Sequence, residues 1–199
     1  MKYYLHRISH EKEVSYALFK GVNENRYISL GWSVFSDTDI LDCARRNDGY
    51  KSFENCYSAK FKDKARSRWN MWYFAQFSKG DIIIVPLDGG KFAVCEVIEQ
   101  AKSIIVLKDS QFKCCGSKKD VYWKDDAFYL DDRKIDLGFV VKVKVLYDKV
   151  SRDDYANSDL TSRLKMRQTN GSIDDIKQSV KETIKALDEK KLSIFMLIQ

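Results

Sequence analysis

The chain is poor in proline, glycine and histidine, with one Pro, nine Gly and two His among its 199 residues. It contains no Pro-, Gly- or Ser-rich linker, so we expect a single domain. The two histidines, His6 and His10, lack the cysteine or acidic cluster that would complete a zinc site, and the sequence predicts no metal and no cofactor. The longest apolar runs fall far short of the roughly 20 residues that a transmembrane helix needs, which predicts that the chain does not cross a membrane.

Cysteine is also sparse. The five cysteines are an odd number, form no C-x-x-C motif and include two adjacent residues that are poor disulfide partners, so we expect reduced thiols. Residues Met1–Ile8 have neither the apolar core nor the small-residue cleavage site of a signal peptide. These features predict a cytoplasmic protein. The cysteines are Cys43, Cys56, Cys95, Cys114 and Cys115.

Positive charge is in modest excess, since 35 Lys and Arg residues face 29 Asp and Glu residues and leave a net charge of +6. Its distribution matters more than its total, because basic residues cluster within 60–68 and again within 163–167. Two basic clusters on a nearly balanced chain predict a polyanionic partner, although each cluster alone can be an ordinary solvated helix face. The candidate contacts to a nucleic-acid backbone are Lys64, Arg66, Arg68, Arg163, Lys165 and Arg167.

Local patterns predict a mixture of strands and helices. β-Branched and aromatic residues bounded by turn residues indicate strands. The segment 64–77 has no Gly or Pro and carries aromatic residues on all sides, which predicts a helix that is buried on most faces. Apolar residues at three- and four-residue spacing predict a C-terminal helix that Ser172 caps, with Asp175 as its capping-box partner. The predicted strands are Tyr3–Ile8, Arg26–Trp32, Ile82–Val85, Lys91–Glu99, Ser103–Leu107 and Gly138–Tyr147.

Three neighbouring stretches carry a resemblance to a known family. The aromatic segment 68–74, the Lys-Gly-Asp turn with its strand at 79–86, and the strand at 92–97 are similar to the helix, turn and two core strands of EVE-type PUA-like domains. They especially resemble the N-terminal modules of bacterial modification-dependent restriction enzymes. The resemblance implies an α+β fold, in which residues 1–150 form a small mixed β-barrel flanked by helices. Residues 151–199 would add a basic segment and a further helix, packed on the same domain.

The resemblance also implies a ligand. YTH and EVE members of this family take an extruded, chemically modified base into an aromatic pocket. A base that leaves its stack loses a few kcal/mol, and stacking on an indole ring returns roughly 1–3 kcal/mol. By this resemblance Trp32 stands where such readers keep a cage tryptophan and Ser33 where they keep a neighbouring polar group. Trp69, Asn70 and Trp72 are further candidates. The alternative is that these tryptophans belong to the core and that Asn70 is a satisfied buried amide.

We therefore expect a nucleic-acid-binding module that recognises a modified or flipped base in DNA or RNA, within a bacterial restriction or defence system. No phosphate-binding loop, nucleophile elbow or metal-ligand set is present in the sequence, so we expect no enzyme activity. Two alternatives stay open. One is a non-catalytic interaction or regulatory subunit whose apolar tail, Leu192–Gln199, docks on a larger protein. The other is a nuclease or hydrolase with a dispersed carboxylate site.

Overall fold

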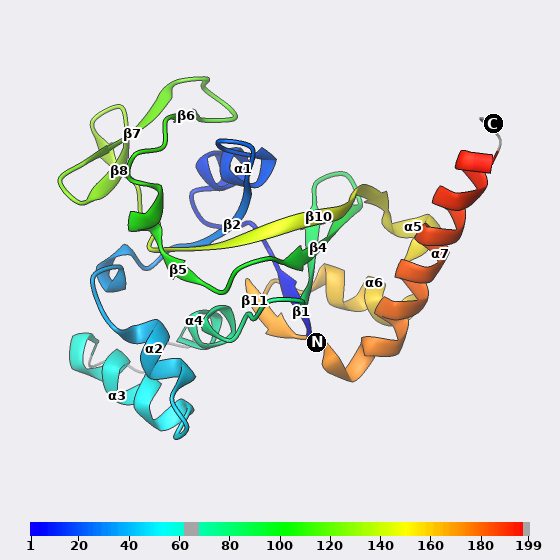
Figure 1. Cartoon of the computed structure of the whole chain (residues 1–199), viewed down its shortest axis with the longest axis horizontal. Coiled ribbons are helices and arrows are strands. Elements are labelled where there is room, and N and C mark those ends of the chain that lie inside the picture. The colour runs from blue at the N-terminus through cyan, green and yellow to red at the C-terminus, as the bar shows by residue number, and fades with distance from the viewer. Residues whose placement is uncertain (62–67, 197–199) are drawn as a thin grey trace.

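The computed structural model describes residues 1–61 and 68–196, except for the side chains of 194–196. A seven-stranded sheet forms the centre of the molecule, with the strand order β11-β1-β3-β4-β10-β2 and with β5 paired to β10. Among the described strands, only β1 and β3 pair in parallel. The sheet curls into half of a barrel, and helices lie around it (Figure 1). Its strands are β1 (Tyr3–His6), β2 (Arg26–Leu30), β3 (Ile82–Leu87), β4 (Lys91–Val97), β5 (Lys102–Ser103), β10 (Phe139–Ser151) and β11 (Asn170–Ser172).

Helices and a second sheet cover the central sheet from several sides. In Figure 1, α2 and α3 lie at the lower left, α6 and α7 at the right, and a four-stranded sheet with the order β6-β7-β8-β9 at the upper left. The chain is therefore a mixed α and β fold with a barrel-like sheet. The helices are α1 (Lys12–Lys20), α2 (Ile40–Arg45), α3 (Tyr50–Lys60), α4 (Arg68–Ala75), α5 (Arg152–Tyr155), α6 (Ser158–Lys165) and α7 (Lys177–Met196). The 3-10 helices are η1 (Ser33–Phe35), η2 (Ile104–Leu107) and η3 (Asp174–Ile176), and the small sheet contains β6 (Phe112–Lys113), β7 (Asp120–Lys124), β8 (Ala127–Leu130) and β9 (Arg133–Lys134).

The middle of the central sheet is buried on both faces. Successive side chains of a strand point to opposite faces, so Ile82 and Ile84 of β3 join one apolar cluster while Ile83 and Val85 join another. The first cluster is closed by α6 and α7, and the second by α2, α3 and α4. This arrangement explains why β3 reads as a continuous apolar run rather than as an alternating one.

Most of the predicted strands are confirmed, with ends that differ by a few residues, and β3 and β4 pair as a hairpin through the turn at 88–90. The strand predicted at Ser103–Leu107 is wrong beyond its first residue. The hydroxyl of Ser103 accepts a hydrogen bond from the backbone N–H of Ile105 at 3.4 Å, and this cap starts the 3-10 helix η2. The capping box predicted at Ser172 is also wrong, because Ser172 ends strand β11 and α7 begins only at Lys177.

The prediction of five reduced thiols is wrong for one pair of cysteines. Cys43 in α2 and Cys56 in α3 form a disulfide, with their Cα atoms 6.7 Å apart. The two helices pack against each other after the chain reverses at Gly49, which has a positive φ of 51°. This reversal brings together two cysteines that no local motif links. The other three cysteines are free thiols.

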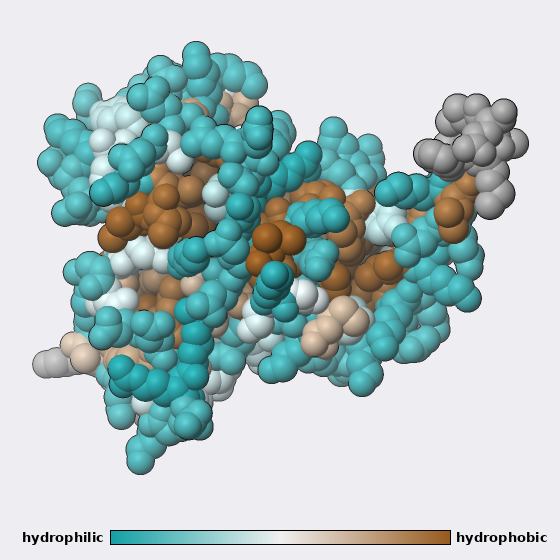
Figure 2. Space-filling model, in the orientation of Figure 1, coloured by the Kyte–Doolittle hydropathy of each residue, from teal (hydrophilic) through white to brown (hydrophobic). Residues whose placement is uncertain are grey.

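The surface is mostly polar. Figure 2 shows hydrophilic residues over the small sheet and along the outer side of α7, with apolar residues visible below the small sheet and between the central sheet and α7. Val106 of η2 is 55% exposed. Within the described residues, no helix combines the length and apolarity needed to span a membrane.

Candidate nucleic-acid interface

The turn after β2 holds Trp32 in an unusual backbone conformation. Its φ of 67° lies in the left-handed region, which a bulky residue seldom adopts. Gly138 lies directly against this turn, because a Cβ atom at position 138 would come within 2.6 Å of the Trp32 carbonyl oxygen. The indole side chain itself is half-buried. Strained conformations of this kind persist only where the surroundings impose them, and they are frequent at functional sites.

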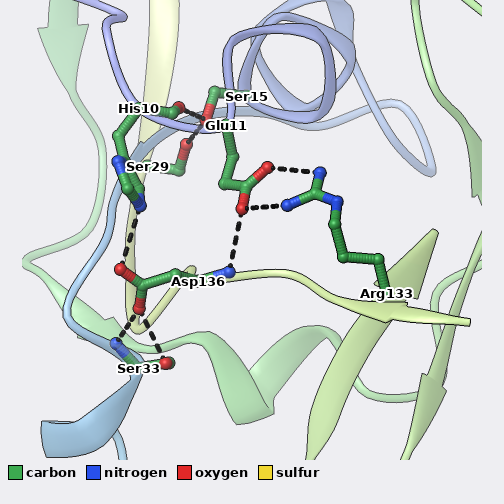
Figure 3. Close-up of polar contacts among 7 residues, drawn as sticks. All are labelled: His10, Glu11, Ser15, Ser29, Ser33, Arg133 and Asp136. Carbon is green, nitrogen blue, oxygen red and sulfur yellow. Dashed lines mark hydrogen bonds and ion pairs between the residues drawn. The ribbon is translucent and has the colours of Figure 1, made fainter.

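A network of polar side chains fixes the same turn (Figure 3). Ser33 donates two hydrogen bonds to Oδ1 of Asp136, from its backbone N–H at 2.8 Å and from its hydroxyl at 2.7 Å. The other carboxylate oxygen of Asp136 lies 2.9 Å from Nε2 of His10. Glu11 accepts the backbone N–H of Asp136 at 3.2 Å and forms two hydrogen bonds of 2.8 Å with Arg133. Side chains from two segments, residues 10–11 and 133–136, therefore hold Ser33 in place.

Ionisation of Asp136 is part of this arrangement. Partial burial opposes the charge, but the hydrogen bonds from Ser33 and the proximity of His10 outweigh it and lower the pKa of the carboxyl group. The geometry is unlike that of a hydrolytic triad, in which histidine lies between serine and aspartate and takes the hydroxyl proton. Here Asp136 lies between Ser33 and His10, so the network fixes the turn but provides no activated nucleophile.

The predicted pocket residues lie along a row of aromatic rings. The indole of Trp32 contacts Tyr57 and Phe61 edge-on, with ring centroids 5.7 and 5.9 Å apart. At the other end of the row, Trp69 stacks on Tyr50 at 4.8 Å. Among the aromatic pairs of the described residues, Trp32 and Trp69 share no partner ring. The structure therefore does not bring them together as two walls of one cage, and Trp69 is 41% exposed on its own side.

Trp72 and Asn70 lie deeper than their neighbour Trp69. Trp72 is half-buried and packs edge-on against Tyr50, with ring centroids 5.3 Å apart. Oδ1 of Asn70 accepts the backbone N–H of Asn170 at 3.2 Å, and the backbone carbonyl of Asn70 accepts the Asn170 side-chain amide at 2.8 Å. These contacts join α4 to β11. They give Asn70 a structural role, and its side chain is half-buried rather than buried.

The same network ends on a buried histidine. Oδ1 of Asn170 lies 2.5 Å from Nδ1 of His6, which is fully buried, and Nε2 of His6 has no hydrogen-bond partner among the described residues. Burial disfavours the charged imidazole and lowers its pKa to about 4, although the hydrogen bond to Asn170 partly opposes this. His6 is therefore a neutral core residue near pH 7.

We expect His6 to make folding stability depend on pH. Its pKa falls from 6.5 to about 4 on folding, so between these values the unfolded chain binds more protons than the folded one. The free energy of unfolding should therefore decrease as the pH drops through this window, by on the order of 3 kcal/mol. Denaturant titrations at several pH values measure the effect. His6→Gln should abolish it and His10→Gln should retain it, and equal pH slopes in wild type and His6→Gln would contradict the prediction.

The residues predicted to contact a nucleic-acid backbone fall into three groups: those in ion pairs, those outside the described residues, and those that line a cavity. Arg68 forms an ion pair with Glu54 at 3.0 Å, and its guanidinium lies over the rings of Tyr50 and Trp69. Lys64 and Arg66 lie outside the described residues. Helix α6 ends at Lys165, so Arg163 and Arg167 do not share a helix face, and Arg163 pairs with Asp175. Lys165 and Arg167 line one cavity.

That cavity, of about 400 Å³, is called here the basic pocket. It lies between the β3–β4 hairpin and the end of α6. Arg7 joins the segment after β1 to the end of α6 at this point. Its guanidinium donates hydrogen bonds to the carbonyls of Leu164 at 2.6 Å and Met166 at 2.8 Å. The pocket is lined by five cations and by no carboxylate. Its lining residues are Arg7, Pro86, Leu87, Gly90, Lys91, Arg152, Leu164, Lys165 and Arg167.

Sequence reasoning missed three of these five cations. Arg7 follows β1, Lys91 begins β4 and Arg152 begins α5, and each stands in a segment without a basic cluster. The chain does signal the hairpin that carries Lys91, but nothing local shows that it faces residues 165–167. The described residues contain no group of three or more His, Cys, Asp or Glu side chains placed to hold a metal ion.

Comparison with family models, curated proteins and solved structures found no match to this chain. Its function must therefore be inferred from the side chains themselves.

Proposed function

We propose that this domain binds a nucleic-acid strand, DNA or RNA, and that the basic pocket contacts its phosphate backbone. The supporting observation is that five cations and no carboxylate line one concave site. Arginine and lysine side chains bind phosphate oxygens through charge-assisted hydrogen bonds, and such contacts supply most of the non-specific affinity for nucleic acids. A solvated helix face would not gather cations from the segment after β1, from β4, from α5 and from the end of α6 around one cavity.

We further propose that the Trp32–Ser33 turn reads a modified or extruded base, and that the half-barrel belongs to the PUA-like, EVE-type class. Three features support this reading. The segment 68–97 resembles that family, the indole of Trp32 is still partly accessible, and Ser33 is fixed by Asp136. The hydroxyl of Ser33 donates to Asp136, which leaves its oxygen lone pairs able to accept from a base.

The turn and the basic pocket are linked through one short segment. Arg7 lines the basic pocket, and His10, three residues later, contacts Asp136 beneath the turn. A strand that bound both places would therefore run along the connection between β1 and α1. Because nucleic acids are intracellular ligands, the proposal implies a cytoplasmic module, such as the reader component of a restriction or defence system.

The decisive experiment is a binding screen with oligonucleotides of DNA and RNA that carry unmodified, methylated or hydroxymethylated bases. Wild type should prefer one modified base. Trp32→Ala should weaken binding of that oligonucleotide roughly 5- to 150-fold, since one stacking contact contributes about 1–3 kcal/mol. Trp69→Ala tests the other end of the aromatic row, and Tyr122→Ala, at an exposed position of the small sheet, is the matched control. Equal binding of all oligonucleotides by wild type and Trp32→Ala would refute base recognition at this turn.

A further inference from the structure

A second and larger cavity lies beside the basic pocket, and the two share a wall. This cavity, called here the wide pocket, measures about 780 Å³ and lies between α1, the β3–β4 hairpin and β10. Leu87 and Lys91 line both pockets. The hairpin that carries these two residues therefore stands between two adjoining sites, one on each side. A ligand with two chemically different parts can occupy both at once.

The wide pocket differs from its neighbour in chemistry. Tyr16 and Phe19 of α1 give it an aromatic wall, and the ring of Tyr16 is half-buried while Phe19 is buried at the base. A cavity of this size accommodates a nucleobase with its sugar, and most of the other residues that line it are charged. The basic pocket, by contrast, offers only cations and the two apolar residues Leu87 and Leu164 beside Pro86 and Gly90.

The charged groups of the wide pocket leave an excess of cations. Two of its carboxylates are paired, since Asp88 lies 3.2 Å from Nζ of Lys12 and Asp148 lies 3.7 Å from a guanidinium nitrogen of Arg26. Among the described residues, the lining cations Lys20, Lys91 and Lys149 take part in no ion pair. The paired carboxylates can accept hydrogen bonds from the amino groups of a base. Lys91 lines both pockets, so its ammonium group can contact a phosphate in either one.

We infer that the two pockets together bind one nucleoside phosphate, with the base in the wide pocket against Tyr16 and the phosphate in the basic pocket. Lys91 stands between the two parts. The ligand is a free nucleotide or one nucleotide unit of a strand, and in the second case the inference rests on the proposed function. The β3–β4 hairpin and α1 would then form a base-binding site that is separate from the Trp32 turn.

Isothermal titration calorimetry with small ligands tests this inference directly. The probes are the four nucleoside monophosphates, ribose 5-phosphate and inorganic phosphate. At least one nucleotide should bind about tenfold more tightly than ribose 5-phosphate, because only the nucleotide can stack on Tyr16. Tyr16→Leu keeps apolar contact with the core but removes the ring, and it should reduce this ratio to about one. Tyr122→Leu is the control for a tyrosine outside both pockets. A ratio that is one in wild type, or unchanged in Tyr16→Leu, would overturn the inference for the free nucleotide.

Oligonucleotides distinguish the two sources of the ligand and separate this inference from the proposed function. An oligonucleotide with bases should bind wild type about tenfold more tightly than the same backbone with abasic sites, and Tyr16→Leu should lose this difference. If Tyr16→Leu loses this difference but still binds the abasic oligonucleotide as wild type does, the two pockets bind one nucleotide unit of a strand. If oligonucleotides bind with salt sensitivity but Tyr16→Leu leaves every ratio intact, the inference fails and the proposed function stands. If nucleotides bind and oligonucleotides do not, the proposed function fails and the site for a free nucleotide stands.

Discussion

Replacing Lys165 and Arg167 together by glutamine is expected to weaken oligonucleotide binding by about a hundredfold near physiological salt. Each charge-assisted contact to a phosphate contributes roughly 1.5 kcal/mol, and the two contacts lie in the same cavity. The slope of the logarithm of affinity against the logarithm of salt concentration should also become shallower by about two, because two fewer counterions are released. Fluorescence anisotropy with a labelled oligonucleotide at several salt concentrations measures both quantities.

The matched control removes the same charge elsewhere. Lys177 and Lys181 lie exposed on α7 and line none of the described cavities, so the double replacement of both by glutamine lowers the net charge equally. If general attraction were responsible, the two double variants would behave alike. That result, or an unchanged salt slope in the Lys165 and Arg167 variant, would show that the basic pocket does not contact the backbone.

Gly138→Ala is expected to destabilise the protein by about 1–3 kcal/mol and to displace the Trp32 turn. The added methyl group would meet the carbonyl oxygen of Trp32 at 2.6 Å and that of Gly31 at 2.9 Å. Both are backbone atoms and cannot move without shifting the turn, which is the usual cause of the cost of overpacking. Because Ser33 follows Trp32 directly, the variant should also lose the preference for a modified base. Denaturant unfolding and the oligonucleotide screen measure the two effects.

Gly116→Ala is a closely matched control for this experiment. A Cβ atom at position 116 would also clash, at 2.1 Å, but only with the carboxylate end of Glu13, which can rotate away. We expect Gly116→Ala to cost much less stability than Gly138→Ala. Equal destabilisation by the two substitutions would mean that the backbone of the Trp32 turn can adjust, and that its left-handed conformation is not imposed by Gly138.

The central strands could be predicted from the sequence because their pattern is local. The apolar run of β3, the turn at 88–90 and the alternation in β10 each lie within about ten residues. Helix α1 could also be predicted from the sequence, because Val14, Ala17 and Leu18 recur at helical spacing, and these residues are buried. Helix α3 was harder to recognise, because only Phe53 and Tyr57 are buried among its eleven residues.

The candidate site was less predictable, because its parts meet only through tertiary contacts. The basic row at 163–167 indicated Lys165 and Arg167, but Arg7 joins them across more than 150 residues of chain. Asp136 gave no signal, since an aspartate in a polar loop is ordinary, and its role depends on Ser33 being placed beside it. The disulfide between Cys43 and Cys56 was hidden for the same reason, as two helices had to pack before the thiols could meet.

The pairing of β11 with β1 bears on how this protein can be dissected in the laboratory. A fragment that stops at residue 150 would leave the backbone of β1 as an open edge and would uncover the apolar side of β3 that α6 and α7 close. Open edges beside apolar surface promote self-association. Such a fragment would aggregate more readily than the intact chain, so binding assays on it would report on precipitating material rather than on a smaller folded domain.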